Sequence, residues 1–209
     1  KERESKLIIG SPGCGKTTKL LNIIDEELSS GTHHNRIAFV SFSVAAIEEA
    51  ISRASSRFRI PRRELRYFKT LHSLAFLVQG LKKENAFEWP QRREFAKLNR
   101  LKLTYCGKED TGFQTPDDKL MDLINLARVM RMSVKDTIRF ARKTADVELG
   151  KALRIEEAFE NYKSSNNLFD YTDTILSVVE GEFVLPELDH LIVDEAQDLS
   201  KLQWDFVFK

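Results

Sequence analysis

Two short stretches of the chain carry residue types that bind phosphate groups and magnesium. The first fits the pattern G-x-x-x-x-G-K-[ST] and consists of Gly10, Ser11, Pro12, Gly13, Cys14, Gly15, Lys16 and Thr17, with Thr18 next in the chain. Glycines let consecutive backbone N–H groups point at oxyanions, and a helix that follows adds its positive end. We therefore predict that residues 10–18 bind the phosphates of ATP, with Lys16 acting in catalysis and the Thr17 hydroxyl binding Mg²⁺. A chance match in a glycine-containing turn is the alternative.

The second stretch follows an apolar run that ends at Val193. Its residues are Asp194, Glu195, Ala196, Gln197 and Asp198. Two acids thus stand where a buried strand reaches the carboxyl edge of a sheet, which is the edge at which open α/β sheets bind ligands. We predict that Asp194 holds Mg²⁺ and that Glu195 orients or deprotonates the water that attacks the outermost phosphate. A strand that ends in a solvated acidic turn is the alternative for this stretch alone.

The elements that position these residues alternate between strand and helix. Apolar runs predict strands at 6–9, 36–42, 65–70 and 190–193, and helical spacing predicts helices at 16–28, 44–54 and 72–78. This alternation predicts an α/β fold with a parallel sheet that helices cover on both faces.

The pattern changes between about residues 80 and 167, where no strongly apolar strand occurs. Helical spacing predicts helices at 117–130, 134–145 and 153–162, and another at 168–179 before a loop at 181–186. We interpret 80–167 as a mostly helical insertion that divides the α/β domain into residues 1–79 and 168–209.

Composition places the chain among ordinary globular proteins, with 42% hydrophobic and 31% charged residues. No apolar run approaches the ~20 residues that span a bilayer, and the two cysteines have no metal-ligand or redox spacing, so we expect an intracellular (cytoplasmic) protein without a membrane partner. The 33 basic and 32 acidic residues nearly cancel, but basic residues gather at 53–69 and 82–108. Each stretch could follow a phosphate backbone or could be a solvated helix face.

Taken together, the two stretches resemble the UvrD/Rep family of superfamily 1 DNA helicases. Three further segments resemble family motifs in the same order. Residues 40–49 resemble motif Ia, residues 69–75 resemble motif Ib, and residues 169–173 resemble the acidic-aromatic segment that precedes the Walker B strand, here 190–193. The resemblance implies a RecA-like P-loop NTPase fold (domain 1A) with 80–167 as its 1B insertion. It implies ATP and Mg²⁺ as cofactors, single-stranded DNA (at a duplex junction) as partner, and a role in DNA repair or replication. By the same resemblance Gln197 senses the outermost phosphate, Phe42 stacks on a base, and Ser43, Thr70 and His72 lie along the DNA. The alternatives are that Phe42 belongs to the core and that His72 caps a helix.

The resemblance also has departures. Val44 and Ala45 stand where the family has Asn-Lys, and we find no adenine-binding glutamine motif, motif III, second RecA-like domain or arginine finger. We expect this stretch alone to be inactive and the intact protein to hydrolyse ATP while moving on single-stranded DNA. The alternatives are a DNA-stimulated motor subunit of a recombination or repair nuclease, a non-motor P-loop nucleotide-binding module such as a kinase, and an inactive scaffold.

Overall fold

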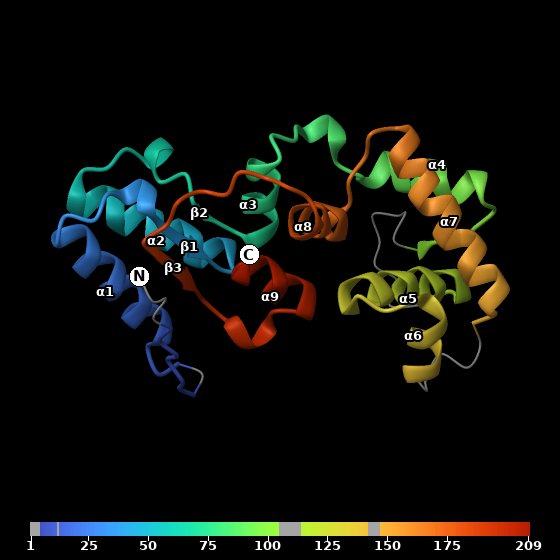
Figure 1. Ribbon diagram of the computed structural model, residues 1–209, viewed down its shortest axis with the longest axis horizontal. Coiled ribbons are helices and arrows are strands. Elements are labelled where there is room, and N and C mark those ends of the chain that lie inside the picture. Colours follow the sequence, from blue (N-terminus) through green and yellow to red (C-terminus); the bar gives the residue numbers. More distant parts are fainter. Residues whose placement is uncertain (1–4, 12, 105–113, 142–146) are drawn as a thin grey trace. The chain divides into compact units, whose positions relative to one another are not determined.

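The computed structural model describes residues 5–11, 13–104, 114–141 and 147–209. Its helices and strands are α1 (Lys16–Ser29), β1 (Ile37–Val40), α2 (Val44–Phe58), β2 (Phe68–Lys69), α3 (Leu71–Val78), α4 (Trp89–Leu98), α5 (Pro116–Met130), α6 (Val134–Phe140), α7 (Leu149–Ser165), α8 (Tyr171–Glu180), β3 (His190–Val193) and α9 (Lys201–Phe208) (Figure 1). The protein is thus mixed α/β and mostly helical. Within the described residues no helix is both long and apolar enough to cross a membrane.

The chain folds into two compact units. The sheet unit contains Lys1–Leu74 and Val184–Asp198, and the helical unit contains Ala75–Phe183 and Leu199–Lys209. Assignment of these parts to a RecA-like core and its insertion stays a prediction.

The sheet unit is built on three parallel strands in the order β2-β1-β3. Phe39 of β1 lies opposite Phe68 of β2, and Val40 of β1 lies opposite Val193 of β3. All four residues of β1 are completely buried, as expected for the central strand of a parallel sheet. Because β1 and β3 run in the same direction and end at the same level, the residues that follow them meet at one edge.

Helices α1 and α2 contribute apolar side chains to the same core as the strands. Apolar positions three or four residues apart on each helix meet alternate residues of β1, which is why the helical and strand periods are both visible in the sequence. The buried cluster consists of Leu21, Ile24, Ile37, Phe39, Ile47, Ala50, Ala54, Leu65, Phe68 and Ile192.

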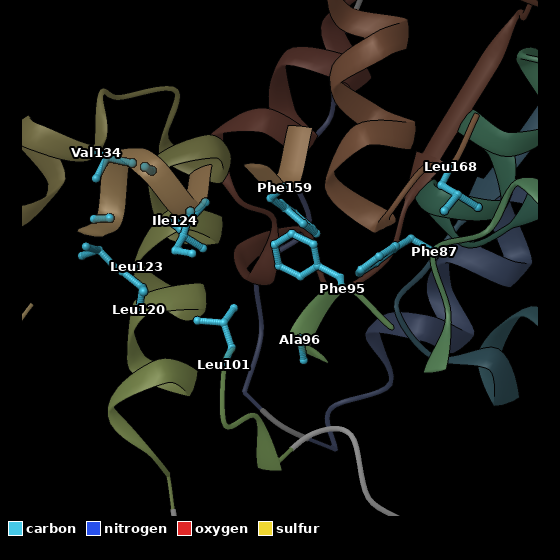
Figure 2. Packing of buried hydrophobic residues seen from close by; sticks show 13 residues of the cluster. Phe87, Phe95, Ala96, Leu101, Leu120, Leu123, Ile124, Val134, Phe159 and Leu168 are labelled. Carbon is cyan, nitrogen blue, oxygen red and sulfur yellow. The ribbon is translucent and has the colours of Figure 1, made fainter. Parts of the chain in front are cut away.

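The helical unit has a separate core that α4, α5 and α7 share. Figure 2 shows the rings of Phe87, Phe95 and Phe159 close together. The ring centroids of Phe87 and Phe159 are 5.2 Å apart, as are those of Phe95 and Phe159. Leu120, Leu123 and Ile124 of α5, with Val134 of α6, extend the cluster. Aromatic rings in tilted and edge-on contact strengthen such a core beyond the area that they bury.

A buried group of charges joins α5, α7 and α8 in the helical unit. Lys163 Nζ lies 2.7 Å from Asp173 and 3.2 Å from Asp170, and Arg128 pairs with both carboxylates. Burial opposes ionisation of Asp170, but the charges of Arg128 and Lys163 outweigh it and lower its pKa to about 2. Burial and the charge of Asp170 raise the pKa of Asp173 above its ordinary value, against the pull of the two cations.

Some predicted elements differ from the structure. Residues 6–9 do not form a strand: the segment is irregular, and Leu7 and Ile9 are 78% and 85% exposed. An apolar run becomes a strand only where another strand pairs with its backbone, and no strand pairs with this segment in the described part of the chain. Helix α8 begins at Tyr171 instead of 168, because Asp170 caps it.

Helix α4 was not predicted because only Phe95 and Ala96 of its ten residues are buried, so its apolar period is weak. Helices predicted at 16–28, 44–54, 72–78, 117–130 and 153–162 are confirmed with small shifts of their ends. The predicted helix 134–145 is confirmed as far as Phe140, and residues 142–145 of that prediction lie outside the described residues.

Candidate functional site

The glycine-rich loop turns directly into helix α1. Gly13 and Gly15 adopt φ values of +76° and +82°, which side chains disfavour, and Gly15 is the residue before the helix. No side chain of the described residues caps this end of α1, so its first N–H groups remain available to an anion. At Gly10 a Cβ would lie 2.3 Å from Cys14 Sγ, so a side chain there would require Cys14 to move. Pro12 lies outside the described residues.

Lys16 folds back over its own loop. Its Nζ donates to the carbonyl oxygens of Gly10 at 2.9 Å and of Ser11 at 3.2 Å. An ammonium group has three donors, so one N–H is left for a phosphate oxygen while the other two hold the side chain at the loop. Thr18 is exposed on the first turn of α1.

Thr17 and Asp194 come together although 177 positions separate them. The Thr17 Oγ1 atom lies 3.3 and 3.4 Å from the two carboxylate oxygens of Asp194. Asp194 follows β3 directly, and its N–H donates to the carbonyl of Val40, which continues the pairing with β1. Burial raises the pKa of Asp194, with the charge of Glu195 adding to the effect and hydrogen bonds from Thr17 and Ser41 opposing it.

Glu195 and Gln197 lie in the turn after Asp194. Glu195 has a φ of +50°, an unfavourable angle for a residue with a side chain, and such strain gathers at functional sites. Gln197 Nε2 donates to Glu195 Oε2 at 2.5 Å, so the two predicted catalytic side chains are in contact. A carboxylate held by a neighbouring amide at the edge of the sheet could orient a water molecule.

The predicted nucleic-acid residues follow the ends of β1 and β2. Phe42 is 44% exposed, so it is not part of the core. The Ser43 hydroxyl accepts from the N–H of Ala46 and caps α2, and the Thr70 hydroxyl accepts from the N–H of Ser73 at the start of α3. His72 is half-buried on the first turn of α3. Ser43 and Thr70 therefore have structural roles whether or not they contact a strand of nucleic acid.

Ser41 was missed by the sequence reasoning. It is buried at the end of β1, and its Oγ lies 3.5 Å from Asp194 Oδ2. A serine that follows a strand has no sequence pattern that distinguishes it from a common loop residue.

Part of the basic stretch at 53–69 serves the sheet unit itself. Arg53 and Arg57 both pair with the buried carboxylate of Asp25, at 2.7 and 2.6 Å, and Arg62 pairs with Glu48. Two carboxylates therefore already pair with three of its seven basic residues.

The structure and the site define a mixed α/β protein with a glycine-rich loop and an acidic strand end at one edge of a small parallel sheet. The sequence matches the UvrD/REP helicase N-terminal domain family over residues 1–209, and the chain belongs to that family. Membership implies a helicase-family function, an ATP-hydrolysing enzyme in the protein that carries the domain, and DNA as substrate. A comparison with individual curated proteins gave no match.

Proposed function

We propose that this chain is the ATP-binding portion of a helicase or translocase that couples ATP hydrolysis to movement along single-stranded DNA. The contact between the Thr17 hydroxyl and the Asp194 carboxylate is the observation that carries the proposal. It joins the phosphate-type loop and the acidic strand end into one site, which the two motifs need if they are to act on one nucleotide.

The residues of this site fit Mg²⁺ bound together with a triphosphate. Mg²⁺ prefers oxygen ligands and in nucleotide sites takes one or two from the protein, with the rest from phosphates and water. Thr17 and Asp194 supply a hydroxyl and a carboxylate, and among the described residues no cluster of three or more His, Cys, Asp or Glu offers a complete protein cage. When bound, the ion would neutralise charge on the outer phosphates.

The protein side chains have distinct roles in this proposal. Lys16 and the N–H groups of the loop hold the phosphates. Glu195 orients the attacking water and takes its proton, and Gln197, hydrogen-bonded to Glu195, keeps that carboxylate in place.

Nucleotide binding to the 209-residue chain tests the site. We expect Lys16→Ala to weaken ADP binding with and without Mg²⁺, and Asp194→Asn to weaken it only with Mg²⁺, both measured by calorimetry. Ser29→Ala is the control, because its hydroxyl donates to the carbonyl of Asp25 at the far end of α1. If Asp194→Asn weakened ADP binding equally with and without Mg²⁺, the assignment of Asp194 as a metal ligand would be refuted.

Hydrolysis is tested in the protein that carries this domain. Glu195→Gln should leave ATP binding unchanged and reduce single-stranded-DNA-stimulated hydrolysis at least 100-fold, since a general base contributes about 10²–10⁴ in rate. Hydrolysis at the wild-type rate in Glu195→Gln would remove Glu195 from the mechanism.

We also propose that Phe42 stacks on a base of the DNA, since it is an exposed aromatic ring beside the nucleotide site. Base–aromatic stacking contributes about 1–3 kcal/mol, so Phe42→Ala should weaken oligo(dT) binding roughly 5- to 150-fold. Phe42→Trp should retain it. Oligo(dT) binding is measured by fluorescence anisotropy, and an unchanged affinity of Phe42→Ala would exclude this role.

A further inference from the structure

The Ser41 hydroxyl makes two hydrogen bonds that lead in different directions. Its Oγ accepts from the backbone N–H of Ser43 at 3.1 Å and lies 3.5 Å from Asp194 Oδ2. Because an N–H can only donate, the hydroxyl is the acceptor toward Ser43, and its single proton is directed to the carboxylate. Ser41 is buried, so water competes little for either bond.

The bond to Ser43 closes the bend that leads from β1 into α2. Phe42 lies between the two serines and is exposed, and Ser43 then caps α2 by accepting from the N–H of Ala46 at 3.3 Å. A continuous path thus runs from the carboxylate of Asp194 through one hydroxyl to the bend and the first turn of α2.

We propose that Ser41 is a positioning residue that aligns Asp194 for Mg²⁺ and couples the metal site to the bend that carries Phe42. This inference rests on the proposed function, because it takes Asp194 as a ligand of Mg²⁺. Hydrogen bonds in series polarise one another, so a cation at Asp194 changes the strength with which the hydroxyl accepts from Ser43. Residues that orient a metal ligand typically change metal affinity 10- to 100-fold when removed.

Two measurements on the full chain test the proposal. The first is ADP binding by calorimetry, without Mg²⁺ and over a range of Mg²⁺ concentrations. The second is the amide signal of Ser43 in ¹⁵N-labelled protein during titration with Mg²⁺ and ADP. Ser41→Ala removes the hydroxyl and Ser41→Thr keeps it. Ser55→Ala is the matched control, because the Ser55 hydroxyl is buried on α2 without a hydrogen-bond partner among the described residues.

We expect Ser41→Ala to need about tenfold more Mg²⁺ for half-maximal ADP binding while its affinity without Mg²⁺ stays within about threefold. Its Ser43 amide should stop responding to Mg²⁺, whereas Ser41→Thr and Ser55→Ala should behave as the wild type. The proposal would be overturned if Ser41→Ala had an unchanged Mg²⁺ requirement or if its Ser43 amide still responded to Mg²⁺. It would also be overturned if Ser41→Ala lost as much ADP affinity without Mg²⁺ as with it. A wild-type chain whose ADP binding ignores Mg²⁺ would instead refute the proposed function.

Discussion

Replacing Lys163 by methionine tests the buried charge group of the helical unit. Lys163 is only 2% exposed, and its Nζ lies near three carboxylates and 4.1 Å from the centre of the Phe159 ring. Methionine keeps most of the length and apolar volume of the stem, so the change removes mainly the positive charge.

The expected loss of unfolding free energy depends on how the remaining carboxylates are paired after the substitution. Asp170 and Asp173 keep Arg128 as a shared partner, which leaves one carboxylate buried without its own cation. Removing one member of a buried ion pair costs about 3–5 kcal/mol of unfolding free energy. Since burial already raises the pKa of Asp173, and the missing cation raises it further, the variant can relieve the strain by protonating this group. A carboxyl whose pKa is raised on folding favours the folded state as the pH falls, so the loss should be smaller at pH 5.5 than at pH 8.

Urea denaturation monitored by tryptophan fluorescence measures the loss of unfolding free energy in the helical unit. Both tryptophans, Trp89 and Trp204, belong to the helical unit. The midpoint should fall by roughly 1–3 M urea in Lys163→Met. Lys135→Met is the matched control: Lys135 is exposed and makes no ion pair with any described residue, so its loss should stay within about 0.5 kcal/mol.

A second substitution should restore much of the stability that Lys163→Met loses. Lys163→Met combined with Asp173→Asn should recover more than half of the lost stability, because removing both partners leaves no unpaired charge. A single variant that loses less than about 1 kcal/mol, or a double variant no more stable than the single one, would refute the account.

Other groups lead to further expected outcomes. Asp118 is completely buried, and hydrogen bonds from Thr115 and Thr104 outweigh burial and lower its pKa, so Asp118→Asn should lose about 2 kcal/mol at pH 7. This stabilisation is present above the ordinary carboxyl pKa and is lost as the pH falls through the lowered folded value, so wild type and variant should converge in urea titrations at decreasing pH. Ser55→Ala should raise the unfolding free energy by up to about 1 kcal/mol, measured by urea denaturation, because it removes a buried unpaired hydroxyl. Gly10→Ala should weaken ADP binding in calorimetry, and adding Cys14→Ala should recover part of it, because the new Cβ meets Cys14 Sγ.

The phosphate loop could be predicted because its requirements are local. The positive φ angles of Gly13 and Gly15 and the start of α1 at Lys16 depend on residues adjacent in the chain. Most helices were predicted for the same reason, since an apolar period within one segment indicates which face is buried. Helix α4, with little apolar period, shows where that signal ends.

The remaining features depend on contacts between distant segments. Residues 6–9 have the composition of a strand, but strand formation needs a backbone partner that composition does not specify. The contact of Ser41 with Asp194 follows from the pairing of β1 with β3, and no spacing along the chain indicates it.

Residue types and their local spacing were enough to identify a loop suited to phosphate, an acidic strand end, and helices with one apolar face. Which charged groups are paired depends on contacts between segments that are distant in the chain. The tertiary structure pairs Arg53 and Arg57 with the buried carboxylate of Asp25 and buries Lys163 among carboxylates, so each of these cations has a partner within the fold. The reason is physical, because Coulomb energy depends on distance in space and on burial, and neither can be read from separation along the chain.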